Sequence, residues 1–204
     1  MKSIYLMVTR TNTAFCKALM KASKEPYPHI SLVLDENFAT GHSFSRLKIH
    51  NPLVGGLKHE EYTQWLTKFP STICKIYKLD VTPQQYDKLN TTLNKWYAKG
   101  NVYGYNLRGV VGRKFNLNIH PKNRYFCSHF VSQILREADI LYFDKPPICT
   151  LASDFMNNEK LELIYDGTLK DLLYQSQAVP REQVEIKIKR RDRVTNYILG
   201  ALNH

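Results

Sequence analysis

Hydrophobic residues along the chain follow two repeats, one typical of strands and one typical of helices. Apolar runs of strand length occur at residues 4–8, 30–34, 38–46, 73–79, 161–165 and 184–189. Stripes with helical spacing occur at residues 15–20, 59–69, 82–99, 127–138 and 194–202. Residues 51–56 and 101–121, with their glycines and prolines, are predicted to be loops. This order of elements predicts an α+β fold in which an antiparallel sheet packs against helices.

One of the helical stripes begins with a cysteine. Cys127 is followed at i+3, i+4, i+7, i+8 and i+11 by apolar residues, namely Phe130, Val131, Ile134, Leu135 and Ala138. A thiol in the first turn of a helix lies in the positive end of the helix dipole, which favours the nucleophilic thiolate. The alternative is that Cys127 is a small buried core residue, which is the common state of a free cysteine.

Two histidines are predicted to lie on one β-hairpin that precedes this helix. With Glu36-Asn37 as the turn, His42 lies opposite Ser31. That register places His42 diagonally across from His29 on the same face, within reach of its side chain. A register that differs by one residue would place Ser43 there instead.

Composition and charge indicate which classes of partner the protein could attract, but they do not decide its function. The 204 residues carry a formal net charge of +11, which suggests attraction to nucleic acid, anionic lipid or an acidic substrate. The basic residues are spread along the chain, and the one cluster, at residues 187–193, is interpreted as a solvated edge strand. We therefore expect no specific nucleic-acid partner, and peripheral contact with a membrane is kept as an alternative.

The four cysteines, Cys16, Cys74, Cys127 and Cys149, are widely spaced and form no C-x-x-C pair. This spacing predicts free thiols in a reducing cytoplasm rather than a disulfide framework or a zinc knuckle. The sequence has no apolar run long enough to span a membrane, and its start lacks the pattern of a signal peptide. We expect a cytoplasmic protein without a cofactor or metal.

A cysteine hydrolase needs a thiolate, a histidine that relays the proton and a polar group that orients the histidine. Cys127, His29 and His42 are predicted to supply these groups from a helix and a facing hairpin. The loop that carries Tyr103 and Tyr105 leads directly into the Cys127 helix, so it is expected to pass over the mouth of the site.

Two other polar residues are candidates for contact with the substrate. Arg10 follows the first strand, where backbone N–H groups and a guanidinium can bind an anion, although plain capping of the next helix explains the same Thr-rich turn. Ser43 belongs to the second arm of the hairpin and is the residue that the alternative register would bring beside His29.

The order of these segments resembles the circularly permuted papain-like superfamily. This superfamily contains permuted relatives of the NlpC-type cell-wall peptidases, including YiiX-like proteins, and the lecithin:retinol acyltransferase-like proteins. The segments that resemble its His-strand and Cys-helix are Pro26-Tyr27-Pro28-His29-Ile30-Ser31-Leu32 and Phe126-Cys127-Ser128-His129-Phe130-Val131. Five further segments resemble the small bacterial YiiX-like subgroup: Thr9-Arg10-Thr11, Ser43-Phe44-Ser45-Arg46, Pro52-Leu53-Val54-Gly55-Gly56, Tyr105-Asn106 and Phe143-Asp144-Lys145-Pro146-Pro147.

The resemblance implies a permuted papain-like, NlpC-type catalytic domain at residues 1–175, followed by a basic extension at residues 176–204 that contains a strand and a helix. It implies Cys127 as nucleophile, His29 as general base and His42 as its orienting partner. There are two departures from the pattern. The position of His42 is often Tyr in the subgroup, and Phe126 stands where the acyltransferase branch has Asn.

The resemblance implies a cysteine peptidase or amidase that cleaves an amide bond in a small peptide-like substrate through a thioester. Three alternatives stay open. The first is a lipid acyl hydrolase or acyltransferase of the same fold. The second is a non-catalytic binding protein that uses its basic surface. The third is a metal site formed by His29, His42 and Cys127.

Overall fold

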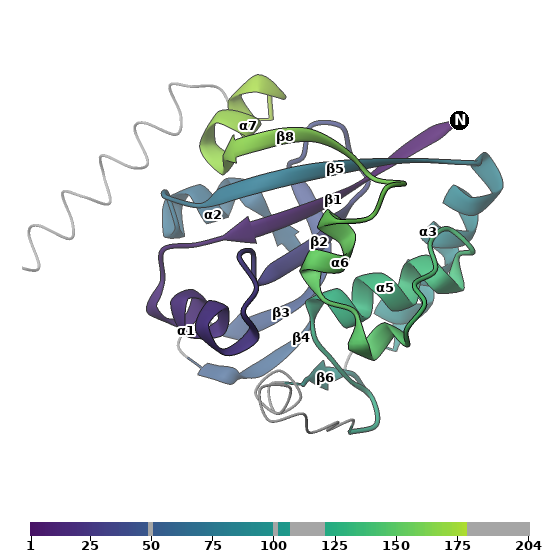
Figure 1. Ribbon diagram of the computed structural model, residues 1–204, viewed down its shortest axis with the longest axis horizontal. Coiled ribbons are helices and arrows are strands. Elements are labelled where there is room, and N and C mark those ends of the chain that lie inside the picture. Colours follow the sequence, from purple (N-terminus) through teal and green to yellow (C-terminus); the bar gives the residue numbers. More distant parts are fainter. Residues whose placement is uncertain (49–50, 100–101, 107–120, 179–204) are drawn as a thin grey trace, which may run out of the picture.

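The computed structural model describes residues 1–48, 51–99, 102–106 and 121–178. Six antiparallel strands form one sheet in the order β4-β3-β2-β1-β5-β8 (Figure 1). The strands are β1 (Lys2–Arg10), β2 (His29–Val33), β3 (Thr40–Lys48), β4 (Asn51–Glu61), β5 (Ile73–Val81) and β8 (Glu162–Thr168). Two short strands, β6 (Gly104–Tyr105) and β7 (Arg124–Tyr125), form a separate parallel pair.

Helices cover both faces of the sheet (Figure 1). They are α1 (Ala14–Ser23), α2 (Tyr62–Lys68), α3 (Pro83–Ala98), α5 (Cys127–Glu137), α6 (Ala152–Met156) and α7 (Leu169–Gln175), with one 3-10 turn, η3 (Pro147–Cys149). One core lies between the sheet and α3, α5 and α6, and contains Cys127. The second core lies between the opposite face and α2 and α7. The prediction of an α+β fold, with an antiparallel sheet packed against the Cys-bearing helix, is confirmed.

Local sequence signals determine where the main helices begin. Thr82 accepts a hydrogen bond from the backbone N–H of Gln85, whose side chain accepts one from the N–H of Thr82, and Pro83 takes the first helical position of α3. Thr13 caps α1 in a similar way through the N–H of Cys16. These helices therefore follow the predicted boundaries closely.

The segment between residues 51 and 69 differs from the prediction. The expected loop at residues 51–56 is part of β4, and the helix expected at residues 59–69 is confined to α2, Tyr62–Lys68. The described part of β4 has glycines and charged residues where an isolated strand would show apolar alternation, so its pairing with β3 overrides a weak local preference.

The β2–β3 hairpin also differs from its predicted register, by one residue. His42 pairs with Leu32 rather than with the residue before it. The connection extends over residues 34–39 instead of a two-residue turn, and within it Phe38 has a positive φ of 54°. The longer connection shifts the returning strand, and a shift of one residue moves every side chain to the other face of the sheet.

Two predicted regions fall outside the described residues. They are residues 107–120 of the loop before the Cys127 helix, and residues 179–204, which include the predicted strand and helix of the basic extension. Within the described ranges, no helix is both long and apolar enough to cross a lipid bilayer.

Candidate active site

Cys127 is the first residue of α5, and its side chain is 7% exposed. The apolar stripe of α5 packs against the sheet, and this packing brings the start of the helix to the loop before β2. There the thiol lies 3.7 Å from the carbonyl oxygen of Pro28, to which it can donate. The backbone of Ile30 and Ser128 also helps to lower the pKa of the thiol. The cysteine is thus held at the helix N-terminus, at the boundary of the core.

His29 is the first residue of β2, and its ring interacts with the Cys127 side chain closely enough to change the pKa of both groups. Its Nε2 atom lies 3.0 Å and 3.2 Å from the two carboxylate oxygens of Glu60. This leaves Nδ1 as the ring nitrogen available to the sulfur. The His29 side chain is 18% exposed, whereas that of Glu60 is fully buried. Cysteine, histidine and carboxylate therefore interact in sequence, with His29 between the other two.

Glu60 comes from β4, the terminal strand of the sheet, two strands away from β2. It pairs with Gly41, so it projects on the face opposite to that of His59 and His42. A buried carboxylate is strongly destabilising unless it is paired. His29 supplies that pairing, because it can accept a proton and so carry the opposite charge.

The charges of the three groups stabilise one another. Burial lowers the pKa of the His29 imidazole, but the Glu60 carboxylate and the Cys127 sulfur outweigh this effect and raise the pKa to about 10. Burial raises the pKa of the Cys127 thiol, but the hydrogen bond and charge of His29 bring it below its ordinary value. Both shifts favour a thiolate–imidazolium pair, the reactive form of a cysteine–histidine site.

His42 does not take the predicted position beside His29. Because it pairs with Leu32, it projects on the face of the sheet opposite to that of Ser31 and His29. Its Nδ1 lies 3.0 Å from the hydroxyl oxygen of Tyr97, and its ring stacks on that of His59 at a centroid distance of 4.8 Å. The prediction that His42 lies within reach of His29 is wrong, and a metal site that needs both rings is not assembled.

The surroundings of His42 make it a site of acid sensitivity. Burial and the neighbouring His59 lower its pKa from 6.5 to about 4, although Glu60 opposes them. The unfolded chain therefore binds a proton more readily, and the stability from neutral His42 is present above about pH 6.5 and lost as the pH falls toward 4. We expect protonation linked to His42 to lower the free energy of unfolding of the wild type by about 2 kcal/mol between pH 7 and pH 5.

Urea unfolding of the wild type and His42→Gln at these two pH values tests this expectation. Gln has no comparable titration, so the free energy of unfolding of His42→Gln is expected to fall less than that of the wild type. An equal fall in both proteins would contradict it.

The residues predicted to contact substrate lie in different surroundings. Ser43 is fully buried and its hydroxyl donates to the carbonyl oxygen of Ile30 at 2.8 Å, which gives it a structural role. Arg10 ends β1, next to Thr9, which pairs with His29, and its guanidinium lies 5.7 Å from the Tyr27 ring. The other two predicted residues lie toward β6: Tyr103 stacks on Trp96, and the side chain of Tyr105 is outside the described residues.

Sequence reasoning missed two neighbours of His29. Glu60 lies in a segment with no alternating apolar pattern, so nothing local indicates a strand or a buried carboxylate there. Trp65 of α2 places its ring 5.7 Å from the His29 ring, tilted by 32°. Residues 59–69 were predicted to be helical, which would give Glu60 an exposed position on a helix. A buried Glu becomes recognisable only once β4 is known to pair with β3.

Comparisons with known proteins find similarity to solved structures. No family model matches the sequence, and no curated protein matches it. Among solved structures, the chain is similar to the metalloprotein YiiX from Escherichia coli O157:H7, with a TM-score of 0.49 and 11% sequence identity. The match covers 82% of this chain and 98% of that chain. Within the described residues of the present chain, no group of three or more His, Cys, Asp or Glu side chains is arranged to hold a metal ion.

Proposed function

We propose that the protein is a thiol hydrolase of papain-like type that cleaves an amide bond in a small peptide-like substrate. The observation that carries this proposal is the contact of His29 with the buried Glu60 carboxylate at 3.0 Å, together with the mutual pKa shifts of His29 and Cys127. Nucleophile, base and orienting group are the three parts that a cysteine hydrolase requires. Glu60 takes the role that the sequence had assigned to His42.

The chemistry begins from the thiolate–imidazolium pair. The Cys127 sulfur attacks the carbonyl carbon of the substrate, and the oxyanion accepts a hydrogen bond from the backbone N–H of Cys127, which lies in the first turn of α5. His29 then gives its proton to the departing amine as the C–N bond breaks, which leaves a thioester on Cys127. Water enters, His29 takes one of its protons, and the resulting hydroxide displaces the thiolate and forms a carboxylic acid.

Amide cleavage suits this site better than ester exchange because an amine must be protonated as it leaves. Against the effect of burial, Glu60 and the Cys127 sulfur together raise the pKa of His29 to about 10, so the imidazole of the resting site carries that proton throughout the neutral range. The alcohol that leaves an ester or a lipid acyl donor is a weaker base than an amine, so its departure depends less on a proton donor. We therefore favour amide cleavage over lipid acyl transfer.

Alkylation with iodoacetamide across pH tests the reactive form of Cys127. We expect Cys127 to react with an apparent pKa below the value of about 8.5 for a free thiol, because His29 stabilises the thiolate. Cys74 should react slowly, since burial and Asp166 raise its pKa to about 12. Peptide mass spectrometry after short exposures measures the rate at each cysteine.

Cys149 is the control for exposure in this experiment, because it is only partly buried while Cys127 is buried. If access alone decided the rates, Cys149 would react first at every pH. Such an order, or a Cys127 midpoint at or above that of a free thiol, would contradict the proposed site.

A further inference from the structure

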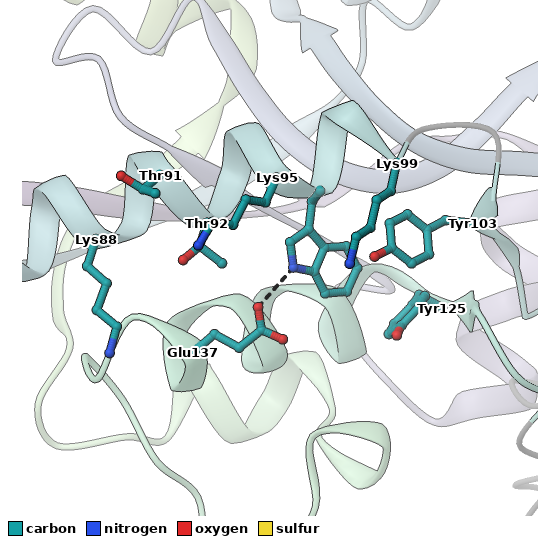
Figure 2. Close-up of a pocket in the computed structure, with 9 residues that line it drawn as sticks. Lys88, Thr91, Thr92, Lys95, Lys99, Tyr103, Tyr125 and Glu137 are labelled. Carbon is teal, nitrogen blue, oxygen red and sulfur yellow. Dashed lines mark hydrogen bonds between the residues drawn. The ribbon is translucent and has the colours of Figure 1, made fainter.

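A second candidate site lies along α3, beyond the capping box at its N-terminus. It is a groove with a volume of about 520 Å³ between α3, the end of α5 and the two short strands (Figure 2). The lining residues are Lys88, Thr91, Thr92, Lys95, Trp96, Lys99, Tyr103, Tyr125 and Glu137. None of them is among the groups that contact the Cys127 sulfur, which are Pro28, His29, Ile30 and Ser128.

One wall of the groove is a row of polar side chains from α3. Thr91, Lys95 and Lys99 follow one another at intervals of four residues, so they lie one above another on the helix surface. Lys95 and Lys99 are both exposed, and within the described part of the chain neither forms an ion pair. Lys88, farther along the wall, is paired with Asp139. Two ammonium groups one turn apart thus face the groove with their charge available.

The other end of the groove is made of aromatic rings that are fixed against one another. Trp96 stacks on Tyr103 at a centroid distance of 4.8 Å, and Tyr125 meets Trp96 edge-on at 4.9 Å. The Trp96 indole N–H donates to Glu137 at 3.0 Å, as the dashed line in Figure 2 shows. Glu137 also accepts a bond from Gln133 at 2.7 Å. Its carboxylate is therefore engaged, and the net field of the groove is positive.

The phenol groups of the two tyrosines add neutral hydrogen-bond donors. Burial, together with nearby Glu137, raises the pKa of Tyr103, and burial is also the main reason for the raised pKa of Tyr125. Both side chains are only partly buried, so their exposed edges and hydroxyls are available to a ligand although the rings pack against one another. The groove thus combines cations and hydroxyls along one wall with a rigid aromatic surface at its end.

From this combination we infer that the groove binds a small phosphate ester that carries a planar ring, the chemistry of a nucleoside monophosphate. Lysine ammonium groups and threonine hydroxyls are suitable donors to phosphate oxygens, and Lys95 with Thr91 or Lys99 can contact one phosphate together. Aromatic side chains take up a base by stacking or edge contact irrespective of its identity. The site is separate from the proposed catalytic centre and does not depend on it.

Fluorescence of Trp96 gives a direct readout of binding. The chain has two tryptophans, so Trp65→Phe leaves Trp96 as the one emitter in the groove. In this background AMP and UMP are expected to change the emission with dissociation constants below about 100 μM. Inorganic phosphate alone, and adenosine or uridine alone, are expected to bind at least about ten-fold more weakly, because each supplies half of the contacts.

A matched pair of double variants tests the position of the site. Lys95→Glu with Lys99→Glu is expected to weaken nucleotide binding at least about ten-fold. Lys17→Glu with Lys21→Glu changes the net charge equally, at two exposed positions with the same spacing on α1, and is expected to alter binding less than about two-fold. Circular dichroism of both variants confirms the fold.

Four results would overturn the inference. They are an absence of mononucleotide binding below about 1 mM, equal affinity for inorganic phosphate alone, equal weakening by the two double variants, and binding of a single-stranded oligonucleotide but of neither mononucleotide.

Discussion

Replacement of Cys127 by alanine is expected to abolish acyl transfer to the protein. Wild-type protein incubated with p-nitrophenyl acetate, or with a peptide p-nitrophenyl ester, should gain the mass of one acyl group as a thioester. The Ala variant has no nucleophile beside His29, so acylation at this site should fall at least about 10⁴-fold. Intact-protein mass spectrometry before and after hydroxylamine, which cleaves thioesters, measures the acylation.

Alanine at the other three cysteines is the matched control for this experiment. Cys74 lies in the second core, Cys16 is buried in α1, and Cys149 lies in η3. Each of these variants should retain the acyl group, because Cys127 and none of the other three thiols contributes to the pKa shift of His29. Persistence of the thioester in Cys127→Ala, or its loss in Cys149→Ala, would contradict Cys127 as the nucleophile.

Replacement of Glu60 by glutamine is expected to have the second largest effect. The amide is neutral, so it no longer opposes the burial that lowers the pKa of His29, and the imidazole loses its proton at neutral pH. Without the adjacent cation, the pKa of the Cys127 thiol rises. We expect the acylation rate at pH 7 to fall about 10²- to 10⁴-fold and the midpoint of iodoacetamide alkylation to move to higher pH.

Two variants separate this effect from a general loss of structure. Glu61→Gln makes the same chemical change at the next residue, which is exposed and accepts a hydrogen bond from Gln64. His42→Gln changes the residue that the sequence had suggested for the role of Glu60. Both are expected to leave the alkylation midpoint unchanged. A shift in His42→Gln equal to that in Glu60→Gln would restore His42 as the orienting group.

The pH dependence of amide cleavage follows from the same pair of groups. The thiolate is lost as the pH falls through the lowered pKa of Cys127, and the proton donor is lost as the pH rises through the value of about 10 for His29. His29 also contributes to stability. Its folded-state pKa lies above 6.5, so its contribution is complete below about pH 6.5 and is lost as the pH rises toward 10.

The sequence predicted those parts of the site that depend on local pattern. The stripe that begins at Cys127 places the thiol at a helix N-terminus, and Pro28 before His29 marks the start of a strand. Both signals extend over a few neighbouring residues, where helical or alternating spacing is easily recognised. The contact between the two residues, which are far apart in the chain, was predicted from the groups that a cysteine hydrolase requires and from the resemblance, because no local pattern indicates it.

The third group depends on long-range pairing, and for this reason the pattern gave the wrong residue. The choice between His42 and Ser43 is set by one residue in the length of a connection, which the turn sequence did not reveal. Glu60 is brought to His29 by β4, whose described residues have no strand-like alternation. A carboxylate in such a segment is expected to be solvated, and tertiary structure alone makes it a buried partner.

Because Glu60 lies on a terminal strand, the residues of the proposed site belong to parts of the sheet that open with different free energies. His29 lies on a strand with neighbours on both sides, whereas β4 is held in the sheet through β3. Sub-global opening at the margin of a sheet requires less free energy than opening at its centre. Fluctuations that release β4 would separate the carboxylate from the imidazole while the Cys127 helix stays folded. Amide exchange in β4 would then report how often the protein exists in a form in which the proposed nucleophile is intact and the proposed base has lost its carboxylate partner.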